Sequence, residues 1–379
     1  MRKHHLLAAI CCLLSIYSCQ KESIAPLPES NTARTETVNE SDYFKINTLE
    51  DLATFEELYV QKDRATSRSA GSRVVHVPSN SKNAIQAAIN EVGHYGVVYL
   101  EKGKHYEEQT ILITHPVFVV GREGATIIAN SQIYDEFGPP AEPIFSIRQT
   151  TRVTIWGVGM QGRAEGSNMG IEILNSTHTV VSKNTINNFQ TAIGINEGDN
   201  TLVWKNNIAG VRAANIQISV GIVVIDGVKV RILQNKISGY IWGIICGSQD
   251  GLIQSNELFG NGIGLNLGFL VPVVVTSDGN LTGSRVSATN WTVQNNYAHH
   301  NQVGYLLSFG ANNNKLINNR GGNNSFLDLI LNTDGFNVLG VPSPASFDNF
   351  VDNENNKDFT IQDCGNNNRV RGGIQFPCN

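Results

Sequence analysis

Charge is scarce in this chain of 379 residues: Asp, Glu, Lys and Arg make up 16% of it, and the formal net charge is -5. Soluble domains usually carry about a quarter of charged residues. No basic stripe with interleaved aromatic residues occurs, and blocks of like charge are absent, so we expect no nucleic-acid partner. Gly is abundant instead, with 36 residues, and Asn recurs in runs such as 312–314 and 366–368, which indicates polar turns.

The N-terminal apolar run, "LLAAICCLLSIY", is too short to span a bilayer as a helix. It follows the charged residues 2–5, and this order is typical of an export signal. The run ends in "IYSC", which resembles the lipobox of bacterial lipoproteins, although Tyr17 is bulkier than usual at its place. The resemblance implies that residues 1–18 are removed and that Cys19 is acylated, which would anchor the protein to a membrane of the cell envelope. The alternative is a plain signal peptide with a chance cysteine.

The chain has six cysteines, two of which lie in the signal segment. Cys246 lies in an apolar strand pattern and is predicted to be a buried small side chain. In an oxidising compartment, Cys364 and Cys378 would close a short C-terminal loop as a disulfide. No spacing indicates a zinc site, so we expect no metal or cofactor, and calcium has no support in the sequence.

Residues 19–73 are predicted to be a polar tether from the lipid, with a short helix at 47–62 where apolar residues recur at helical spacing. The folded domain is predicted to span residues 74–379. It begins with a strand at Val74, an amphipathic helix over 83–92 and then a row of strands. A helix at this place would cap the first apolar face and strand edge of a stack.

A repeated pattern follows, in which an apolar strand ends in one Gly or Asn and then resumes. The intervals are roughly 21 to 39 residues, a turn of about 22 residues plus insertions, and such periods indicate a solenoid. Gly and Asn adopt the left-handed backbone conformation at low cost, so each predicts a sharp corner, and stacked Asn amides can bond to one another. The predicted corner residues are Gly121, Gly157, Asn184, Asn206, Asn235, Asn256, Asn295 and Asn319.

These features predict an all-β fold, a right-handed parallel β-helix (solenoid) with an N-terminal capping helix. The segment "IQAAINEVGHYGVVYLEKGKHYEE", the Asn corners and the Gly-Ile strands resemble the pectate-lyase-like group of parallel β-helix proteins from Val74 onward. The resemblance implies a groove along one sheet, walled by long loops, and a polysaccharide partner. Most enzymes of the group are polysaccharide lyases, hydrolases, esterases or uronate epimerases. Insertions at 133–143, 161–168, 212–219 and 271–288 therefore mark where a site is expected.

The strand after each corner alternates inward and outward side chains. Inward positions are predicted to run from Ile193 and Ile195 on one turn to Leu327 and Leu329 on the last. The outward row is apolar in its middle, so either something covers it or it is a binding surface. Its polar members, predicted to bind substrate, are Glu172, Asn266 and Asp328.

A lyase must remove a proton beside a uronate carboxylate, so it needs a base and positive charge. His299 and His300 are the candidate base and neutraliser, Tyr240 an acid or base, and Arg212 a cation. Each follows its corner by a few residues, which places them near one edge. The alternative is that the adjacent histidines are solvated turn residues.

Tyr297 and Trp242 are candidate platforms for sugar rings, although strict alternation from Ile244 points Trp242 into the core. The clustered Asp residues of polygalacturonases, the Asp pair of pectin methylesterases and the Asp-Pro-His signature of alginate epimerases are absent. Two functions remain: a lipid-anchored enzyme acting on polysaccharide, by elimination rather than hydrolysis, or a non-catalytic β-helix that binds glycan or forms a surface structure. The oligomeric state stays open.

Overall fold

The computed structural model describes residues 73–129, 143–162, 167–210, 219–271, 284–332, 336–338 and 341–378. Several sequence predictions lie outside these ranges: the signal, the acylated Cys19, the helix at 47–62 and Arg212. Within the described residues, the chain forms one helix, three parallel sheets and two short antiparallel hairpins.

The predicted helix over 83–92 is confirmed as α3 (Ala84–Val92). Its buried residues, Ile85, Ala88, Ile89 and Val92, follow the spacing of one helical face. At its first turn the Glu107 carboxylate accepts a hydrogen bond from the Ile85 N–H at 3.0 Å. The helix contacts β1, β2 and β4 and so covers the apolar start of the coil.

The sheet here named sheet A is formed by twelve parallel strands. In order they are β1 (Val74–Val77), β2 (Gly96–Leu100), β5 (Val117–Gly121), β8 (Thr154–Trp156), β11 (Val180–Ser182), β14 (Leu202–Trp204), β17 (Arg231–Leu233), β20 (Leu252–Gln254), β25 (Thr292–Gln294), β28 (Lys315–Ile317), β33 (Phe350–Asp352) and β35 (Arg369–Arg371).

Sheet B has nine strands. They are β3 (Gly103–Glu107), β6 (Ala125–Ala129), β9 (Gly159–Gln161), β12 (Thr185–Asn187), β15 (Asn207–Ala209), β18 (Lys236–Ser238), β21 (Glu257–Phe259), β26 (Tyr297–His299) and β29 (Arg320–Gly322).

Sheet C has eleven strands. They are β4 (Ile111–Ile113), β7 (Phe145–Arg148), β10 (Ser167–Leu174), β13 (Phe189–Asn196), β16 (Val220–Val224), β19 (Trp242–Cys246), β22 (Ile263–Leu267), β27 (Val303–Leu307), β30 (Leu327–Leu331), β34 (Thr360–Asp363) and β36 (Ile374–Phe376). The hairpins pair β23 (Phe269–Val271) with β24 (Ser284–Val286) and β31 (Phe336–Val338) with β32 (Val341–Ser343).

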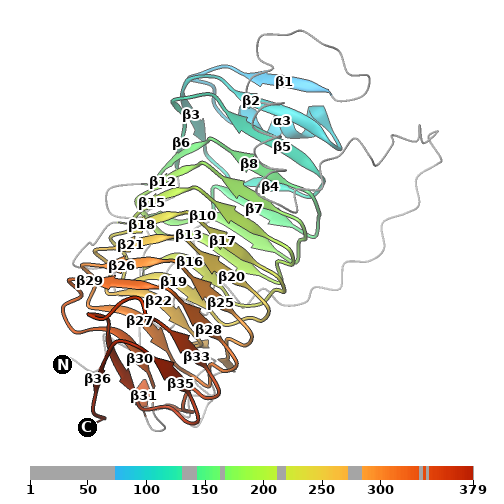
Figure 1. Cartoon of the computed structure of the whole chain (residues 1–379). Helices are drawn as coiled ribbons and strands as arrows, with labels where there is room; N and C mark the ends of the chain where they lie inside the picture. Colours follow the sequence, from blue (N-terminus) through green and yellow to red (C-terminus); the bar gives the residue numbers. More distant parts are fainter. Residues whose placement is uncertain are drawn as a thin grey trace, which may run out of the picture. The chain divides into compact units, whose positions relative to one another are not determined.

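From β2 to β30 each turn of the coil visits sheets A, B and C in the same order, the last two turns have strands in sheets A and C only, and successive turns stack strand on strand (Figure 1). The fold is a right-handed parallel β-helix, as the sequence predicts. Every strand points one set of side chains inward, so identical positions on successive turns meet in the core. Ile186, Ile208 and Ile237 of neighbouring turns, for example, are fully buried.

An amide ladder runs along the corner between sheets A and B. From Asn184 through Asn206, Asn235, Asn256 and Asn296 to Asn319, each side-chain Nδ2 donates to the next Oδ1 at 2.9 to 3.0 Å. The ladder residue of one turn is therefore Asn296, so the prediction of Asn295 as a ladder residue is wrong by one position, whereas its predicted left-handed conformation is confirmed by a φ of 56°.

The left-handed residue at this corner precedes the ladder asparagine, so the predicted conformation of the ladder residues is also wrong. Lys183, Lys205 and Ser255 hold this position with φ of 53°, 52° and 55°. The ladder amide must point into the core, which its extended backbone permits, and the outward-facing residue before it makes the turn. Two further ladders, which the sequence analysis missed, are Asn261, Asn301 and Asn324, and Asn314, Asn349 and Asn368.

The register of sheet C corrects the last predicted inward pair. Tyr305 pairs with Leu329 and Leu307 with Leu331, so the inward residues of β30 are Leu329 and Leu331 rather than Leu327 and Leu329. The prediction was out of register by two residues.

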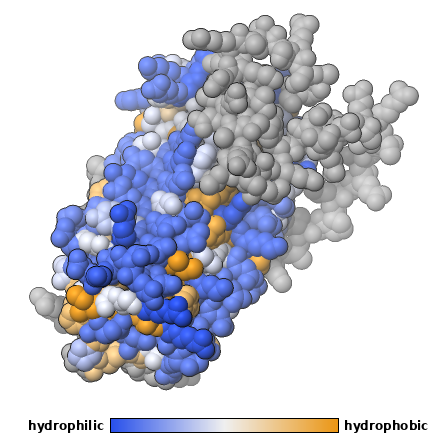
Figure 2. Space-filling view, in the orientation of Figure 1, coloured by the Kyte–Doolittle hydropathy of each residue, from blue (hydrophilic) through white to orange (hydrophobic). Residues whose placement is uncertain are grey.

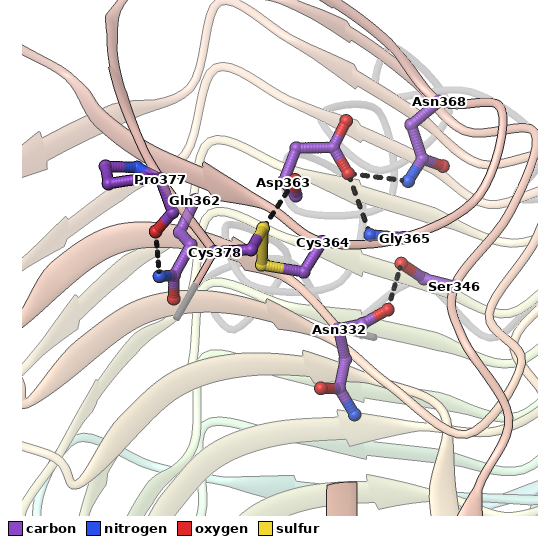
Figure 3. Close-up of a disulfide and its surroundings, with 9 residues drawn as sticks. All are labelled: Asn332, Ser346, Gln362, Asp363, Cys364, Gly365, Asn368, Pro377 and Cys378. Carbon is purple, nitrogen blue, oxygen red and sulfur yellow. Dashed lines mark hydrogen bonds between the residues drawn. A yellow bond between two sulfur atoms is a disulfide. The ribbon is translucent and has the colours of Figure 1, made fainter. Parts of the chain in front are cut away.

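A disulfide joins Cys364 to Cys378, with Cα atoms 5.7 Å apart (Figure 3). It links the residue after β34 to the segment after β36, the edge strand that pairs with β34. The Gln362 side-chain amide adds a hydrogen bond to the Pro377 carbonyl at 2.7 Å. The last turn is thus covalently closed, whereas Cys246 is a free, buried thiol whose pKa is raised by burial.

Candidate functional site on sheet B

Titratable and aromatic side chains gather on the outer face of sheet B. In β18, β21 and β26 the middle residues, Ile237, Leu258 and Ala298, point inward and are fully buried. The flanking residues therefore point outward, and the register aligns them on successive strands. We name the group the sheet B cluster; it consists of Lys236, Glu257, Phe259, Tyr297, His299, His300 and Arg320.

Glu257 lies at the centre of the charged part of the cluster. Its carboxylate is 3.2 Å from the Lys236 ammonium and 3.2 Å from Nε2 of His299. Desolvation raises the pKa of Glu257, but the hydrogen bonds from His299 and Lys236 outweigh it and leave the pKa below its usual value. Glu257 is therefore ionised near neutral pH and accepts a hydrogen bond from the protonated Nε2 of His299.

His299 is held between two aromatic rings. Its ring is stacked 4.3 Å from Tyr297 and 5.5 Å from Phe259, and its side chain is only 14% exposed. Nδ1 of His299 lies 2.7 Å from Nδ1 of His300. With Nε2 donating to Glu257, Nδ1 of His299 is left as the acceptor for a proton on Nδ1 of His300. This chain of hydrogen bonds leaves Nε2 of the exposed His300 as a free acceptor.

The backbone at His300 is in the left-handed conformation, with φ of 55°. The corresponding corner residues on the two preceding turns, Gly239 and Gly260, have φ of 76° and 63°. A residue other than Gly costs about 1 kcal/mol or more in this region, although His is among the better tolerated. The two preceding turns thus use glycine at this corner and the following turn uses Asn323, with φ of 51°, so His300 is the bulkiest of these four corner residues.

Two cations flank the cluster. The Lys236 ammonium lies 4.9 Å from the centre of the Phe259 ring, and the Arg320 guanidinium lies 5.1 Å from the centre of the Tyr297 ring. Among the described residues, no carboxylate lies within 4.0 Å of the Arg320 guanidinium. This cation is consequently available to a negatively charged group in solution.

Tyr240, predicted as a catalytic acid or base, is a core residue. It is fully buried, and burial raises the pKa of its phenol far above the usual value, so it cannot exchange protons near neutral pH. The Tyr240 N–H donates a hydrogen bond at 3.0 Å to Oδ1 of Asn261, the first residue of the ladder that continues with Asn301 and Asn324, because Gly239 turns the chain one residue earlier. Gly210 makes room: a Cβ there would lie 2.9 Å from the Tyr240 ring.

Trp242, Glu172 and Asn266 lie on sheet C and not in the cluster. Trp242 pairs with Val220 and Ile263 on the neighbouring strands. Its side chain is only half-buried, so it does not lie in the core as strict alternation from Ile244 predicts. Glu172 accepts hydrogen bonds from Arg148 at 2.9 Å and Ser146 at 2.6 Å. The Oδ1 of Asn266, itself buried, accepts one from Ser308 at 3.0 Å.

Asp328, predicted to point outward, is 7% exposed and engaged by its neighbours. Its carboxylate accepts hydrogen bonds from the Asn324 amide at 2.6 Å and from the N–H and hydroxyl of Thr360 at 2.9 and 3.0 Å. The register error in β30 set Asp328 level with Leu306, whereas the observed pairing sets it level with Gly304 near the start of the strand, where Asn324 and Thr360 reach it. The structure therefore brings together only His299, His300 and Tyr297 of the predicted site residues, and Arg212 lies outside the described residues.

The sequence analysis missed Lys236, Glu257, Phe259 and Arg320. Each lies in the three-residue strand that directly follows a ladder asparagine, one or three positions after it. The signal was present, because aligning the corners also aligns these positions on successive turns. The cluster has no metal-binding character: within the described residues, no group of three or more His, Cys, Asp or Glu side chains could hold an ion.

The outer surface in Figure 2 is mainly hydrophilic over its described part, with scattered hydrophobic patches. No helix in the described ranges is long and apolar enough to cross a membrane.

No protein-family model and no curated protein matches the sequence. Solved structures do match. Open reading frame 18 of Geobacillus virus E2 has a TM-score of 0.52 and 13% identity over 87% of this chain and 64% of its own. The chain therefore covers less than two thirds of that protein.

Two polygalacturonases are similar over most of their length. The hyperthermoactive exopolygalacturonase from Thermotoga maritima has a TM-score of 0.51 and 12% identity, over 86% of this chain and 96% of its own. The polygalacturonase from Erwinia carotovora has a TM-score of 0.50 and 13% identity, over 82% and 98%. The shared feature is the parallel β-helix. At this identity the likeness shows the fold alone.

Proposed function

We propose that the protein is a cell-envelope lipoprotein that cleaves an acidic polysaccharide by elimination at the sheet B cluster. The observation that carries this proposal is the chain of hydrogen bonds from Glu257 through His299 to His300. It orients His300 with Nε2 free and exposed, as a general base requires. The polygalacturonases among the structural neighbours support a polysaccharide substrate.

In the proposed reaction, Nε2 of His300 removes the proton from the sugar carbon next to the carboxylate. The electron pair of that C–H bond forms a carbon–carbon double bond, and the bond to the glycosidic oxygen breaks. The leaving oxygen takes a proton from water. Glu257 stabilises the positive charge that develops on the histidine pair, and Arg320 neutralises the substrate carboxylate.

Glycan binding without catalysis is the second candidate. It is favoured by the contacts of His299, whose two nitrogens and two ring faces are all engaged by neighbours, an arrangement that also suits a rigid binding surface. In this case Tyr297 and Arg320 contact the sugar and no bond is broken.

Incubation of the purified full-length protein with a panel of uronate polymers and neutral polysaccharides distinguishes the two. An eliminase produces unsaturated uronates that absorb in the ultraviolet, together with new reducing ends. Activity that disappears in His299→Ala and His300→Ala supports the site. Slower migration of the protein in an affinity gel that contains a polymer, without any cleavage product, would support glycan binding without catalysis. If no polymer gave either products or slower migration, both functions would be rejected.

The lipid anchor at Cys19 has its own test. Mass spectrometry of the N-terminal peptide is expected to show acylated Cys19, and Cys19→Ser is expected to move the protein from the membrane to the soluble fraction. An unmodified Cys19, or cleavage elsewhere, would contradict the anchor.

A further inference from the structure

A polar pocket lies beside the sheet B cluster, at the corner between sheets A and B on the last turns of the coil. It encloses about 400 Å³, within the size range of small-ligand sites of roughly 300–1,000 Å³. Six asparagines and one arginine line it. They are Asn295, Asn318, Asn319, Arg320, Asn353, Asn355 and Asn356.

The pocket arises where the corner changes composition. On earlier turns the left-handed position holds Lys183 and Lys205, whose ammonium groups lie over tryptophan rings. On the turns of the pocket, the same position holds Asn295 and Asn318, with φ of 56° and 51°. These shorter side chains replace a long cation by amide donors and acceptors at the mouth of the pocket.

Asn353 ends the amide ladder and is a buried residue of the pocket lining. Its Oδ1 accepts a hydrogen bond from the Asn319 N–H at 3.1 Å, but no further ladder asparagine follows it. The residue is 1% exposed, and its Nδ2 has no hydrogen-bond partner among the described residues. Like the other ladder amides it points into the core, so a ligand in the pocket would meet the exposed side chains of Asn295, Asn318 and Asn355 instead.

The charges around the pocket select the sign of that ligand. Arg320 is the single charged residue of the lining, and no carboxylate lines it. The nearest acidic residues along the chain, Asp352 and Glu354, lie outside the lining, and Asp352 is engaged by the Glu354 N–H at 3.5 Å. A guanidinium beside exposed amide groups, with no carboxylate in the lining, fits a carboxylate or sulfate oxygen.

We propose that this pocket binds the anionic group of an acidic sugar, with Arg320 pairing to the anion and the asparagine amides bonding to the anion and the hydroxyls. Arg320 also lies over the Tyr297 ring, so the pocket and the sheet B cluster share one cation. In this respect the inference rests on the proposed function: it makes an acidic saccharide the ligand and gives it a second contact point one corner away from His300.

Isothermal titration of the full-length protein with glucuronate, galacturonate, inorganic sulfate, and the neutral sugars glucose and galactose tests the pocket. Binding of the uronates but not of the neutral sugars is expected, and Arg320→Gln should weaken it roughly tenfold. Asn355→Ala, at an exposed residue whose loss leaves the ladder intact, should weaken it about threefold. Arg371→Gln is the matched control, because Arg371 is an exposed arginine on β35 that lies over Phe350 and outside the lining.

Binding of sulfate as tightly as the uronates would identify a general anion site, and the preference for acidic sugars would then be wrong. Equal binding of neutral sugars, or equal loss in Arg371→Gln, would overturn the proposal. Uronate binding that depends on Arg320 but not on His300, in a protein without eliminase activity, would keep the pocket and reject the proposed reaction. Eliminase activity that depends on His300, with uronate binding unchanged in Arg320→Gln, would reject the pocket and the role of Arg320 and keep His300 as the base.

Discussion

Sheets B and C present opposite kinds of outer surface. On sheet C the outward row Ser146, Val223, Ile245 and Asn266 is buried, and Glu172 is paired to Arg148. On sheet B the outward residues include the histidine pair, with His300 exposed and both cations reaching rings at the surface. Three of the four insertions, 133–143, 161–168 and 212–219, lie at turns from sheet B to sheet C that precede the cluster along the chain, and the fourth, 271–288, lies between sheets C and A.

Long insertions and titratable side chains therefore need not lie on the same turns of a coil. Sequence reasoning expects the site where loops are longest, because loops on a rigid scaffold carry function. Among the described residues, however, the titratable groups converge on β18, β21 and β26, three-residue strands that pass to sheet C through the short turns 239–241, 260–262 and 300–302. Register places them there: three-residue strands expose two side chains each, and stacking brings those of adjacent turns within contact distance.

The largest expected effect is on the elimination rate, which should depend on sheet B and not on sheet C. His300→Asn should lower the elimination rate at least about 100-fold, since a general base typically contributes 10²–10⁴-fold. Asn adopts the left-handed conformation as readily as His, so the fold should be kept. Glu172→Gln on sheet C is the matched control and should change the rate less than about twofold. Equal losses in both variants would contradict a site on sheet B.

The free energy of unfolding should instead depend more on the ion pair of sheet C than on that of sheet B. Arg148→Ala leaves the Glu172 carboxylate, 16% exposed, with only the Ser146 hydroxyl as a side-chain partner, and we expect the free energy of unfolding to fall by about 1–3 kcal/mol. Lys236→Ala removes a more exposed pair on sheet B and should cost less than about 1 kcal/mol. Urea unfolding of both variants measures this, and the reverse order would refute the contrast in burial.

The Glu257 carboxylate predicts a pH dependence confined to sheet B. Its pKa is lowered in the folded protein, so its stabilising contribution is present above the unfolded pKa of about 4.3 and is lost as the pH falls through the folded pKa. Glu257→Gln should therefore be less stable than the natural chain at pH 7, and the difference should vanish in acid. Unfolding curves across this range provide the measurement; a difference that grows in acid would have the wrong sign.

The smallest effect is expected in the core between the two sheets. Tyr240→Phe removes a buried hydroxyl that has no partner among the described residues, so stability should stay within about 1 kcal/mol or rise. The elimination rate should be unchanged. A large loss of activity with an intact fold would restore Tyr240 as a catalytic residue.

The sequence predicts the repeat well because a coil has few degrees of freedom. The Asn corners define the turns, and the capping helix follows from its apolar spacing. The finer errors differ in kind: the ladder amide lies one position after Asn295, and β30 pairs two residues away from its predicted register, which keeps the side chains on the same faces but moves each along the strand. His299, His300 and Tyr297 were found from their residue types, whereas Glu257 and Arg320 become visible only when neighbouring turns are stacked in register.

Hydroxyl-radical footprinting with an oligouronate bound tests the choice between the sheets most directly, because both carry oxidisable side chains. The account predicts protection of Tyr297, His300 and Phe259 on sheet B, with Trp242 and Met169 of sheet C unchanged. Protection of Trp242 and Met169, with the sheet B side chains oxidised at the rate of the free protein, would contradict it.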